Sequence, residues 1–344
     1  MTCLRRWLGL SKEFKGWEIP EDVVKIREEI RTMVIRGAGK IARAGASALA
    51  EAAKAFNGSD VEDFLRYMMA VGEYVKSARP TAVSLPNAVA YVLNRLRKAR
   101  PSSLGEAVNL VIRSADEFIT YSKNSVKIIG ELGARRIANG DVVMTHCHST
   151  VAVSVIATAH KHGKVNKVFV KETRPRMQGL ITAKALADAG LDVILIPDSS
   201  VRYFMKKVNK VVVGADTIAA NGAVINKVGT SVVALAAKEA RVRTYVAAET
   251  YKFSPLTVVG ELVPIEIRSP EEVVSKEWLE SNPNVRIFNP AFDVTPPEYI
   301  DAIITEKGVI PPQAAILILM EEYGLNISDL LTHMVELRED ELRE

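Results

Sequence analysis

The sequence predicts an α/β protein with an N-terminal helical domain followed by a Rossmann-like domain on a mostly parallel sheet. Two observations predict this class. From about residue 20 to residue 138, apolar residues recur at three- and four-residue spacing between Pro and Gly breaks, as in amphipathic helices. Beyond residue 139, short apolar runs alternate with helical stretches, as in parallel sheets covered by helices. We therefore expect one domain over residues 1–138 and another over residues 139–344.

The helical domain should contain five helices, the last ending at Asn139-Gly140, a pair that tolerates the left-handed conformation. The expected ranges are 21–34, 38–56, 61–78, 85–98 and 104–138. The apolar runs that should form parallel strands are 141–145, 167–171, 192–196, 210–214 and 243–248. Ligands of such sheets bind beyond the carboxyl ends of the strands, so the residues that follow these runs are the first candidates for function.

Composition and charge argue against several classes of protein. The 344 residues are 48% hydrophobic and 25% charged with a net charge of +4, which suits a large core and gives no bulk attraction for nucleic acid. No apolar run reaches membrane length, and Cys3 and Cys147 are too few for a disulfide framework. We expect a cytoplasmic protein that binds neither nucleic acid nor membrane. Glutamine occurs only at Gln178 and Gln313, which hints at a thermophilic source.

Cys147 stands where an apolar run ends and a helix-like stretch begins. The amides and the positive dipole end of a following helix favour thiolate over thiol, which would supply a base or nucleophile near neutral pH. A lone cysteine is otherwise commonly a small buried core residue. His146 and His148 flank it without a second cysteine pair or a carboxylate at ligand spacing, so we expect no metal site.

Asp216 also follows an apolar run and should lie at a second strand end, where partial burial raises a carboxyl pKa toward that of a general acid. The alternative is an aspartate that caps the next segment. Further on, Asn226 and Lys227 stand beside Gly229 and Thr230, which should begin a helix. Free amides at a helix start bind anions, so this stretch suits phosphate, although Gly-Thr also starts ordinary helices.

Four other segments offer polar groups. Arg36 begins Arg-Gly-Ala-Gly at the start of an expected helix, where a solvated turn between helices is the alternative. Arg79 precedes a proline that fixes an extended entry to the next helix. Lys252 follows the last expected strand and either points into the same crevice or is a surface lysine. The residues from Glu172 to Gln178 either shape the wall of a site or link strand to helix.

Together these motifs resemble one superfamily. Arg-Gly-Ala-Gly, Arg-Pro-Thr-Ala-Val, Thr-His-Cys-His-Ser, Glu-Thr-Arg-Pro, Gly-Ala-Asp, Ile-Asn-Lys-Val-Gly-Thr and Asn-Pro-Ala-Phe-Asp-Val-Thr-Pro-Pro occur in its order, from about residue 20 to the C-terminal region. The superfamily unites ribose-1,5-bisphosphate isomerase, 5-methylthioribose-1-phosphate isomerase and the regulatory subunits of eukaryotic translation initiation factor 2B. Residues 1–18 fall outside the resemblance.

The resemblance implies a sugar-phosphate isomerase. The isomerases carry a cysteine and an aspartate that match Cys147 and Asp216, whereas the translation-factor subunits generally lack the cysteine. The stretch around Lys252 looks like the bisphosphate isomerase more than the methylthio enzyme, which needs an apolar slot in place of a second phosphate clamp. The implied reaction converts ribose 1,5-bisphosphate to ribulose 1,5-bisphosphate in AMP salvage, with Cys147 as base, Asp216 as acid and no cofactor. The implied substrate-binding residues are Arg36, Gly37, Ala38, Gly39, Arg79, Ser149, Asn226, Lys227 and Lys252.

The family pattern also implies an assembly, either a homodimer through the C-terminal domain or a hexamer built as a trimer of dimers. Two alternative functions remain open. One is the methylthio enzyme, and the other is a regulatory protein that binds nucleotides or a translation factor without doing chemistry.

Overall fold

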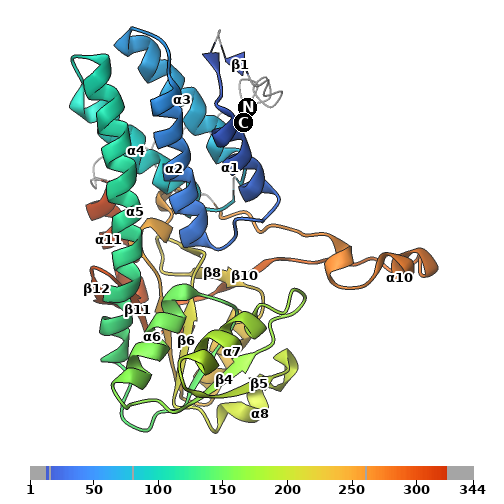
Figure 1. The fold of residues 1–344 in the computed structure, drawn as a ribbon. Coiled ribbons are helices and arrows are strands. Elements are labelled where there is room, and N and C mark those ends of the chain that lie inside the picture. Colours follow the sequence, from blue (N-terminus) through green and yellow to red (C-terminus); the bar gives the residue numbers. More distant parts are fainter. Residues whose placement is uncertain (1–12, 15–16, 80, 260–261, 324–344) are drawn as a thin grey trace, which may run out of the picture. The chain divides into compact units, whose positions relative to one another are not determined.

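A computed structural model describes residues 13–14, 17–79, 81–259 and 262–323 (Figure 1). The chain divides into two compact units, Met1–Asn124 and Ser125–Glu344. The division falls inside helix α5 (Leu104–Ala134), which starts in the first unit and ends in the second. The boundary between residues 138 and 139 that the sequence suggests stays a prediction.

The first unit is helical, and the five helices expected from the spacing of apolar residues are present. Its elements are β1 (Glu13–Phe14), β2 (Trp17–Glu18), α1 (Glu21–Arg31), α2 (Ala38–Ala55), α3 (Val61–Lys76), α4 (Ser84–Ala99) and the beginning of α5. Helix α3 begins where the Asp60 carboxylate accepts a hydrogen bond from the Asp63 amide at 2.9 Å, which satisfies one free amide of the helix start. The alanine-rich α2 packs against α4, and Leu49 and Leu85 of these helices are fully buried.

The second unit is built on a seven-stranded sheet in the order β12-β11-β9-β6-β3-β4-β5. Neighbouring strands are parallel except at the edge, where β12 pairs antiparallel with β11. The strands are β3 (Val143–Thr145), β4 (Lys167–Lys171), β5 (Asp192–Ile196), β6 (Lys210–Gly214), β9 (Arg243–Ala247), β11 (Ala302–Thr305) and β12 (Gly308–Ile310). The predicted fold class and the five predicted strands are confirmed; β11 and β12 were not predicted.

Helices cover both faces of this sheet (Figure 1). Along β6, Val211 and Val213 belong to one apolar cluster and Val212 to the other. The first cluster includes residues of α8, α9 and α11, and the second includes residues of the end of α5, α6 and α7. Burial on both faces explains why the strands read as continuous apolar runs. The covering helices after α5 are α6 (Thr150–Lys161), α7 (Gly179–Asp188), α8 (Val201–Met205), α9 (Thr230–Glu239) and α11 (Ala315–Tyr323), whereas α10 (Lys276–Ser281) belongs to neither cluster.

A smaller antiparallel sheet, in the order β10-β8-β7, follows the end of β6. Its strands are β7 (Thr217–Ile218), β8 (Val224–Lys227) and β10 (Phe292–Thr295). Its register sets Lys227 opposite Phe292 and Asn226 opposite Asp293. Asn226 and Lys227, expected only beside a helix start, lie in strand β8, which was not predicted. Within the described ranges, no helix is long and apolar enough to cross a membrane.

Candidate active site

The order of the parallel strands fixes where a ligand site belongs. Counted along the chain, β5, β4, β3, β6, β9 and β11 are the third, second, first, fourth, fifth and sixth strands of the parallel sheet. In sheets of this order, ligands bind at the carboxyl edge between the first and fourth strands, because the connections diverge there and leave a crevice. Cys147 follows β3 and Asp216 follows β6, and these two strands are hydrogen-bonded neighbours.

Cys147 occupies a strained turn that its neighbours hold in place. Its φ of 66° lies in the left-handed region, which costs a non-glycine residue roughly 1–2 kcal/mol. Its amide donates to Thr173 Oγ1 at 2.9 Å, and its carbonyl oxygen accepts from the Thr182 hydroxyl at 2.8 Å. The side chain is buried, and Sγ lies 3.7 Å from Gln178 Oε1. Because side chains hold both backbone groups, the direction of the thiol is fixed.

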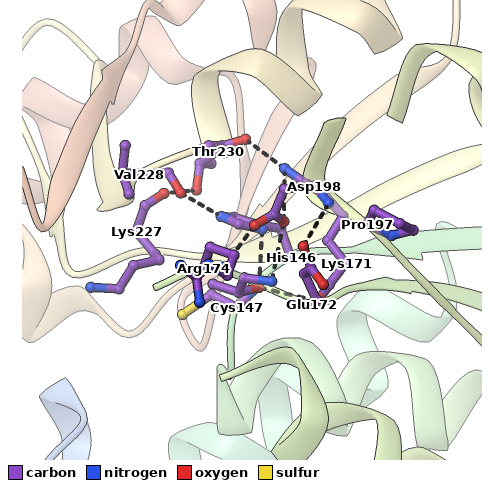
Figure 2. Close-up of polar contacts among 12 residues, drawn as sticks. His146, Cys147, Lys171, Glu172, Arg174, Pro197, Asp198, Lys227, Val228 and Thr230 are labelled. Atoms are coloured by element: carbon purple, nitrogen blue, oxygen red, sulfur yellow. Dashed lines mark hydrogen bonds and ion pairs between the residues drawn. The ribbon is translucent and has the colours of Figure 1, made fainter. Parts of the chain in front are cut away.

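A chain of buried hydrogen bonds continues behind Cys147 (Figure 2). His146 Nε2 lies 2.9 Å from the Val228 carbonyl oxygen, which can only accept, so this nitrogen carries the proton. His146 Nδ1 is then an acceptor at 3.2 Å from the Thr173 hydroxyl, whose single proton also has the Lys171 carbonyl oxygen as an acceptor at 3.1 Å. Burial lowers the pKa of His146 to about 3, and the charge of Lys171 acts in the same direction, so the imidazole is neutral. These hydrogen bonds join the Cys147 turn to the loop after β8.

An ion pair between a buried lysine and a half-buried aspartate supports these hydrogen bonds. The Lys171 ammonium lies 3.6 Å from Asp198 Oδ1 and donates to the Gly229 carbonyl oxygen at 3.3 Å. Asp198 Oδ1 also accepts from the Thr173 amide at 3.1 Å. Gly229 has a φ of 98°, and a Cβ at this position would lie 3.2 Å from His146 and from Lys171 Nζ. A larger residue at Gly229 would therefore press on the network that holds Cys147.

The thiol of Cys147 differs from the sequence-based expectation of a thiolate. Burial raises its pKa to about 12; Lys227 opposes this effect and Asp216 adds to it. The helix start contributes little because α6 begins only at Thr150, and the dipole effect falls off within the first turn. Ser149 caps this helix by accepting from the Ala152 amide at 3.3 Å. Figure 2 shows the sulfur of Cys147 and the ammonium of Lys227 pointing to the same side, away from Lys171 and Asp198.

Asp216 is half-buried at the junction of β6 and β7. A strand follows it, so the alternative that it caps a helix is wrong. Its amide donates to the Ile225 carbonyl oxygen at 3.0 Å, which ties the junction to β8. Its charge acts on the pKa of both Cys147 and Lys227. The three side chains therefore share one electrostatic neighbourhood.

The start of α9 already holds a carboxylate of the protein. Asp293 Oδ2 accepts from the amides of Gly229 and Ser231 at 2.7 and 3.1 Å. A phosphate near this helix would have to be bound by the side chains of Asn226 and Lys227 instead of by these two amides. The Asn226 side chain itself donates to the Thr230 hydroxyl at 3.0 Å.

Lys252 lies in the turn after β9, and its side chain is buried, so the alternative of a surface lysine is wrong. Its ammonium lies 2.7 Å from Glu249 Oε2, and the other oxygen of that carboxylate accepts from the Tyr251 hydroxyl at 2.9 Å. The carboxylate of Glu249 therefore balances the positive charge of Lys252. A contact between Lys252 and a phosphate therefore requires the pair to open or the carboxylate to move aside.

The first unit gathers its own predicted residues at one end. Gly37, with a φ of 89°, precedes α2, and in the described part of the chain no side chain caps this helix start. The Ser84 hydroxyl at the start of α4 donates to the Ala38 carbonyl oxygen at 3.0 Å. The Arg-Gly-Ala-Gly turn therefore lies beside the entry to α4 that Arg79 precedes. Arg36 is exposed and Arg79 is half-buried.

An open pocket lies at the same edge of the second unit, and residues of the segment 172–178 form part of its wall, which was one of the two alternatives for that segment. Its lining residues are Arg174, Pro175, Arg176, Gln178, Lys227, Val228, Arg268, Glu272, Asn289 and Ala291. Gln178 connects the pocket to the thiol of Cys147. Gln178 and Thr173 belong to a segment whose position after a strand was a usable signal. Asn289 begins the Asn-Pro-Ala-Phe-Asp motif and so carried a signal, whereas Arg268 lies in a stretch without helical or strand periodicity, which gave none.

Comparison with known proteins shows close relatives. The ribose 1,5-bisphosphate isomerase of Pyrococcus furiosus is 54% identical over 312 residues, which cover 90% of this chain and 96% of that protein. The enzyme of the same name from Thermococcus kodakarensis is 52% identical over 309 residues, 89% of this chain and 96% of that protein.

Solved structures give the same architecture. A translation initiation factor eIF-2B of Pyrococcus horikoshii has a TM-score of 0.73 and 32% identity, covering 86% of this chain and 99% of that chain. The 5-methylthioribose 1-phosphate isomerase of the same organism has a TM-score of 0.72 and 32% identity, covering 94% of this chain and 92% of that chain.

This is a Rossmann-like α/β protein with a candidate anion site where the strand order reverses. At that point a cysteine and an aspartate follow adjacent strands, and a cationic pocket lies beside them. The model of the initiation factor 2 subunit family matches residues 34–312, and the chain belongs to this family.

Proposed function

We propose that the chain converts ribose 1,5-bisphosphate to ribulose 1,5-bisphosphate, with Cys147 as base and Asp216 as acid. Relatives at 52 and 54% identity are named ribose 1,5-bisphosphate isomerase, and the chain is a sugar-phosphate isomerase. One observation carries the assignment of roles. Cys147 and Asp216 follow the adjacent strands β3 and β6, and Lys227 acts electrostatically with both.

The substrate explains why an acid and a base are needed. The phosphate on the anomeric oxygen blocks spontaneous ring opening, so Asp216 protonates the ring oxygen while Cys147 removes the proton on C2. The bond between C1 and the ring oxygen breaks as the C1–C2 double bond forms, and the resulting enol keeps its phosphate on C1. Cys147 then returns a proton to C1, and Asp216 takes the proton of the C2 hydroxyl, which forms the ketone and restores both groups. Well-placed proton transfer contributes roughly 10²- to 10⁴-fold per group.

This cycle begins with a thiolate and a protonated carboxyl, so the pair holds one proton in total. Burial raises the pKa of the thiol and keeps that proton on sulfur, whereas Lys227 favours its loss. Passing the proton from Cys147 to Asp216 starts the cycle without a proton from solvent. The neutral His146 behind Cys147 does not compete for it, because its pKa is lowered by burial.

The second unit favours a bisphosphate over a methylthio sugar. Four cationic side chains line the pocket beside Cys147: Arg174, Arg176, Lys227 and Arg268. An apolar methylthio group would leave such a wall without a counter-charge. The first unit supplies Arg36, Gly37, Ala38, Gly39 and Arg79 as further candidates. The methylthio enzyme stays the alternative, because a protein of that name shares the fold at 32% identity.

Assaying both sugar phosphates side by side tests the proposal. Wild-type protein should form ribulose 1,5-bisphosphate and leave 5-methylthioribose 1-phosphate unchanged. Cys147→Ser and Asp216→Asn should each lower kcat by roughly 10²- to 10⁴-fold and still bind the bisphosphate, whereas the exposed Asp188→Asn control should not. A fully active Cys147→Ser variant would contradict the role of Cys147 as the base. Absence of activity with either sugar would support a regulatory protein instead.

Isotope labelling separates proton transfer from a hydride shift. In D₂O, a proton relayed by Cys147 can exchange, so the product should carry deuterium at C1. A hydride that moves directly from C2 to C1 leaves the product unlabelled, which would remove Cys147 from the role of base.

We place this reaction in the cytoplasm and in AMP salvage, and we expect a homodimer or a hexamer. Exposed apolar side chains support an assembly: Val232 and Leu235 on α9 are 53 and 50% exposed, and Leu317 on α11 is 61% exposed. Light scattering of the purified protein should give a mass of two or six chains, and a monomer at micromolar concentration would contradict the expectation.

A further inference from the structure

The pocket beside Cys147 has more positive than negative charge in its wall. Four of its lining residues are cations, and Glu272 is the single carboxylate among them. Arg176 pairs with Glu272 at 3.5 Å, and Arg174 donates to the Val273 carbonyl oxygen at 3.1 Å. These two arginines are exposed at the rim. Lys227 and Arg268 lie deeper.

Lys227 and Arg268 form the inner part of this wall. The Arg268 side chain is 10% exposed, and Lys227 is 6% exposed. Both cations face the ring of Phe292, at 4.5 Å from the centroid for Lys227 and 5.9 Å for Arg268. After burial, the charge of Arg268 is the largest cause that lowers the pKa of Lys227. Two nearly buried like charges therefore repel each other beside one aromatic ring.

The protein offsets this repulsion only in part. Arg268 pairs with Glu266 through Nε at 3.1 Å. Lys227 takes part in no ion pair among the described residues, and its ammonium donates to the Ala291 carbonyl oxygen at 2.9 Å. A dianion in the pocket would screen the two cations from each other. The Arg268 guanidinium suits a phosphate dianion well, because a planar guanidinium binds two oxygens of one phosphate at once.

We propose that Arg268, with Lys227 and the rim residue Arg176, forms a phosphate subsite that holds one phosphate of the sugar bisphosphate beside Cys147. This rests on the proposed function for the identity of the sugar. The subsite makes Arg268 a substrate-binding residue for a phosphorylated sugar; both candidate sugars carry a phosphate on C1, so Arg268 alone does not choose between them. Arg268 also lowers the pKa of Cys147, so a phosphate bound here also changes the field at the thiol.

Titration with inorganic phosphate tests the subsite without turnover. We would compare the wild-type full chain with Arg268→Met, Arg268→Lys and Arg286→Met by calorimetry. Arg286 lies in the same stretch of chain but is exposed and outside the pocket, so it is the matched control. Phosphate affinity should fall about 10- to 100-fold in Arg268→Met, less in Arg268→Lys, and stay unchanged in Arg286→Met. Equal affinity in Arg268→Met and wild type, or no phosphate binding by the wild type, would overturn the proposal.

Two further readouts complete the test. In Arg268→Met, KM for ribose 1,5-bisphosphate should rise about 10- to 100-fold, with a smaller change in kcat. If circular dichroism shows that Arg268→Met does not fold, the exposed Arg176→Met carries the test, with an expected loss of phosphate affinity of about threefold or more, and unchanged affinity there counts against the subsite. Phosphate binding that depends on Arg268 in a chain without isomerase activity would refute the proposed function and keep the subsite.

Discussion

Thr173→Val removes one hydroxyl from the network behind Cys147 and leaves the shape of the side chain almost unchanged. In the wild type this hydroxyl accepts from the Cys147 amide at 2.9 Å, and its proton has two acceptors, the Lys171 carbonyl oxygen at 3.1 Å and His146 Nδ1 at 3.2 Å. Thr173 is 1% exposed, so water cannot take its place. Each buried group left without a partner costs about 1–3 kcal/mol, which gives about 2–6 kcal/mol for the pair.

Urea titration followed by circular dichroism measures this loss as a lower midpoint at an unchanged slope. Thr244→Val is the matched control. Thr244 is also 1% exposed, but its hydroxyl has no hydrogen-bond partner in the described part of the chain, so its removal should cost less than about 0.5 kcal/mol. If the two variants were equally stable, the network would not hold the turn as argued.

Thr173 is a positioning residue, so the variant should also change the thiol. Without its acceptor, the Cys147 amide no longer fixes the left-handed turn, and Sγ should become more accessible. Alkylation by iodoacetamide at pH 8 should be faster in Thr173→Val than in Thr244→Val, and kcat should fall about tenfold or more at constant fold. An unchanged alkylation rate together with wild-type kcat would refute the positioning role.

Three more predictions follow from buried groups. Lys252→Met should destabilise the protein by about 3–5 kcal/mol, because Glu249 then lies buried without its cation. Adding Glu249→Gln should restore most of the lost stability in urea titration. An unchanged midpoint in Lys252→Met would contradict the ion pair. The folded pKa of His146 is about 3 and its ordinary value is 6.5, so its contribution to stability is present above pH 6.5 and is lost as pH falls toward 3. His146→Gln should therefore flatten the urea midpoint between pH 7 and 4, and a curve parallel to the wild type would speak against a buried neutral imidazole. Because the pKa of Cys147 is raised to about 12, its alkylation rate should still increase between pH 8 and 10, and a plateau below pH 8 would show a thiolate.

The regular part of the fold is readable from the sequence because one force dominates it. The five helices of the first unit and the five strands 143–145, 167–171, 192–196, 210–214 and 243–247 bury apolar side chains at a regular period. Strand β8 was not predicted because it is short and carries Asn226 and Lys227, whose polar side chains interrupt the apolar pattern of a strand. Strands β11 and β12 lie in a C-terminal stretch whose apolar runs are brief.

The candidate site is predictable only where a residue follows a regular element. Cys147 and Asp216 could be found because each follows an apolar run, and the neighbouring positions of β3 and β6 bear out the expected adjacency. Asp293, which binds the start of α9, comes from strand β10, and Arg268, which approaches Lys227, comes from irregular chain; both lie far away in sequence from these partners. No local pattern encodes such contacts. The state of the thiol was mispredicted because burial outweighs a helix start, and burial depends on the packing of the whole unit.

The strand order also makes part of the second unit separable from the chemistry. The segment between Cys147 and Asp216 in sequence, from α6 to α8, builds the half of the sheet that holds β4 and β5, whereas the strands that precede these two residues, β3 and β6, pair directly at Val143 and Lys210. The loop between α7 and β5 lies at the far edge of the sheet, so a change in its length leaves the pairing of β3 with β6 in place. Evolution or design can use that edge as an attachment point, for a sensor domain or a new contact.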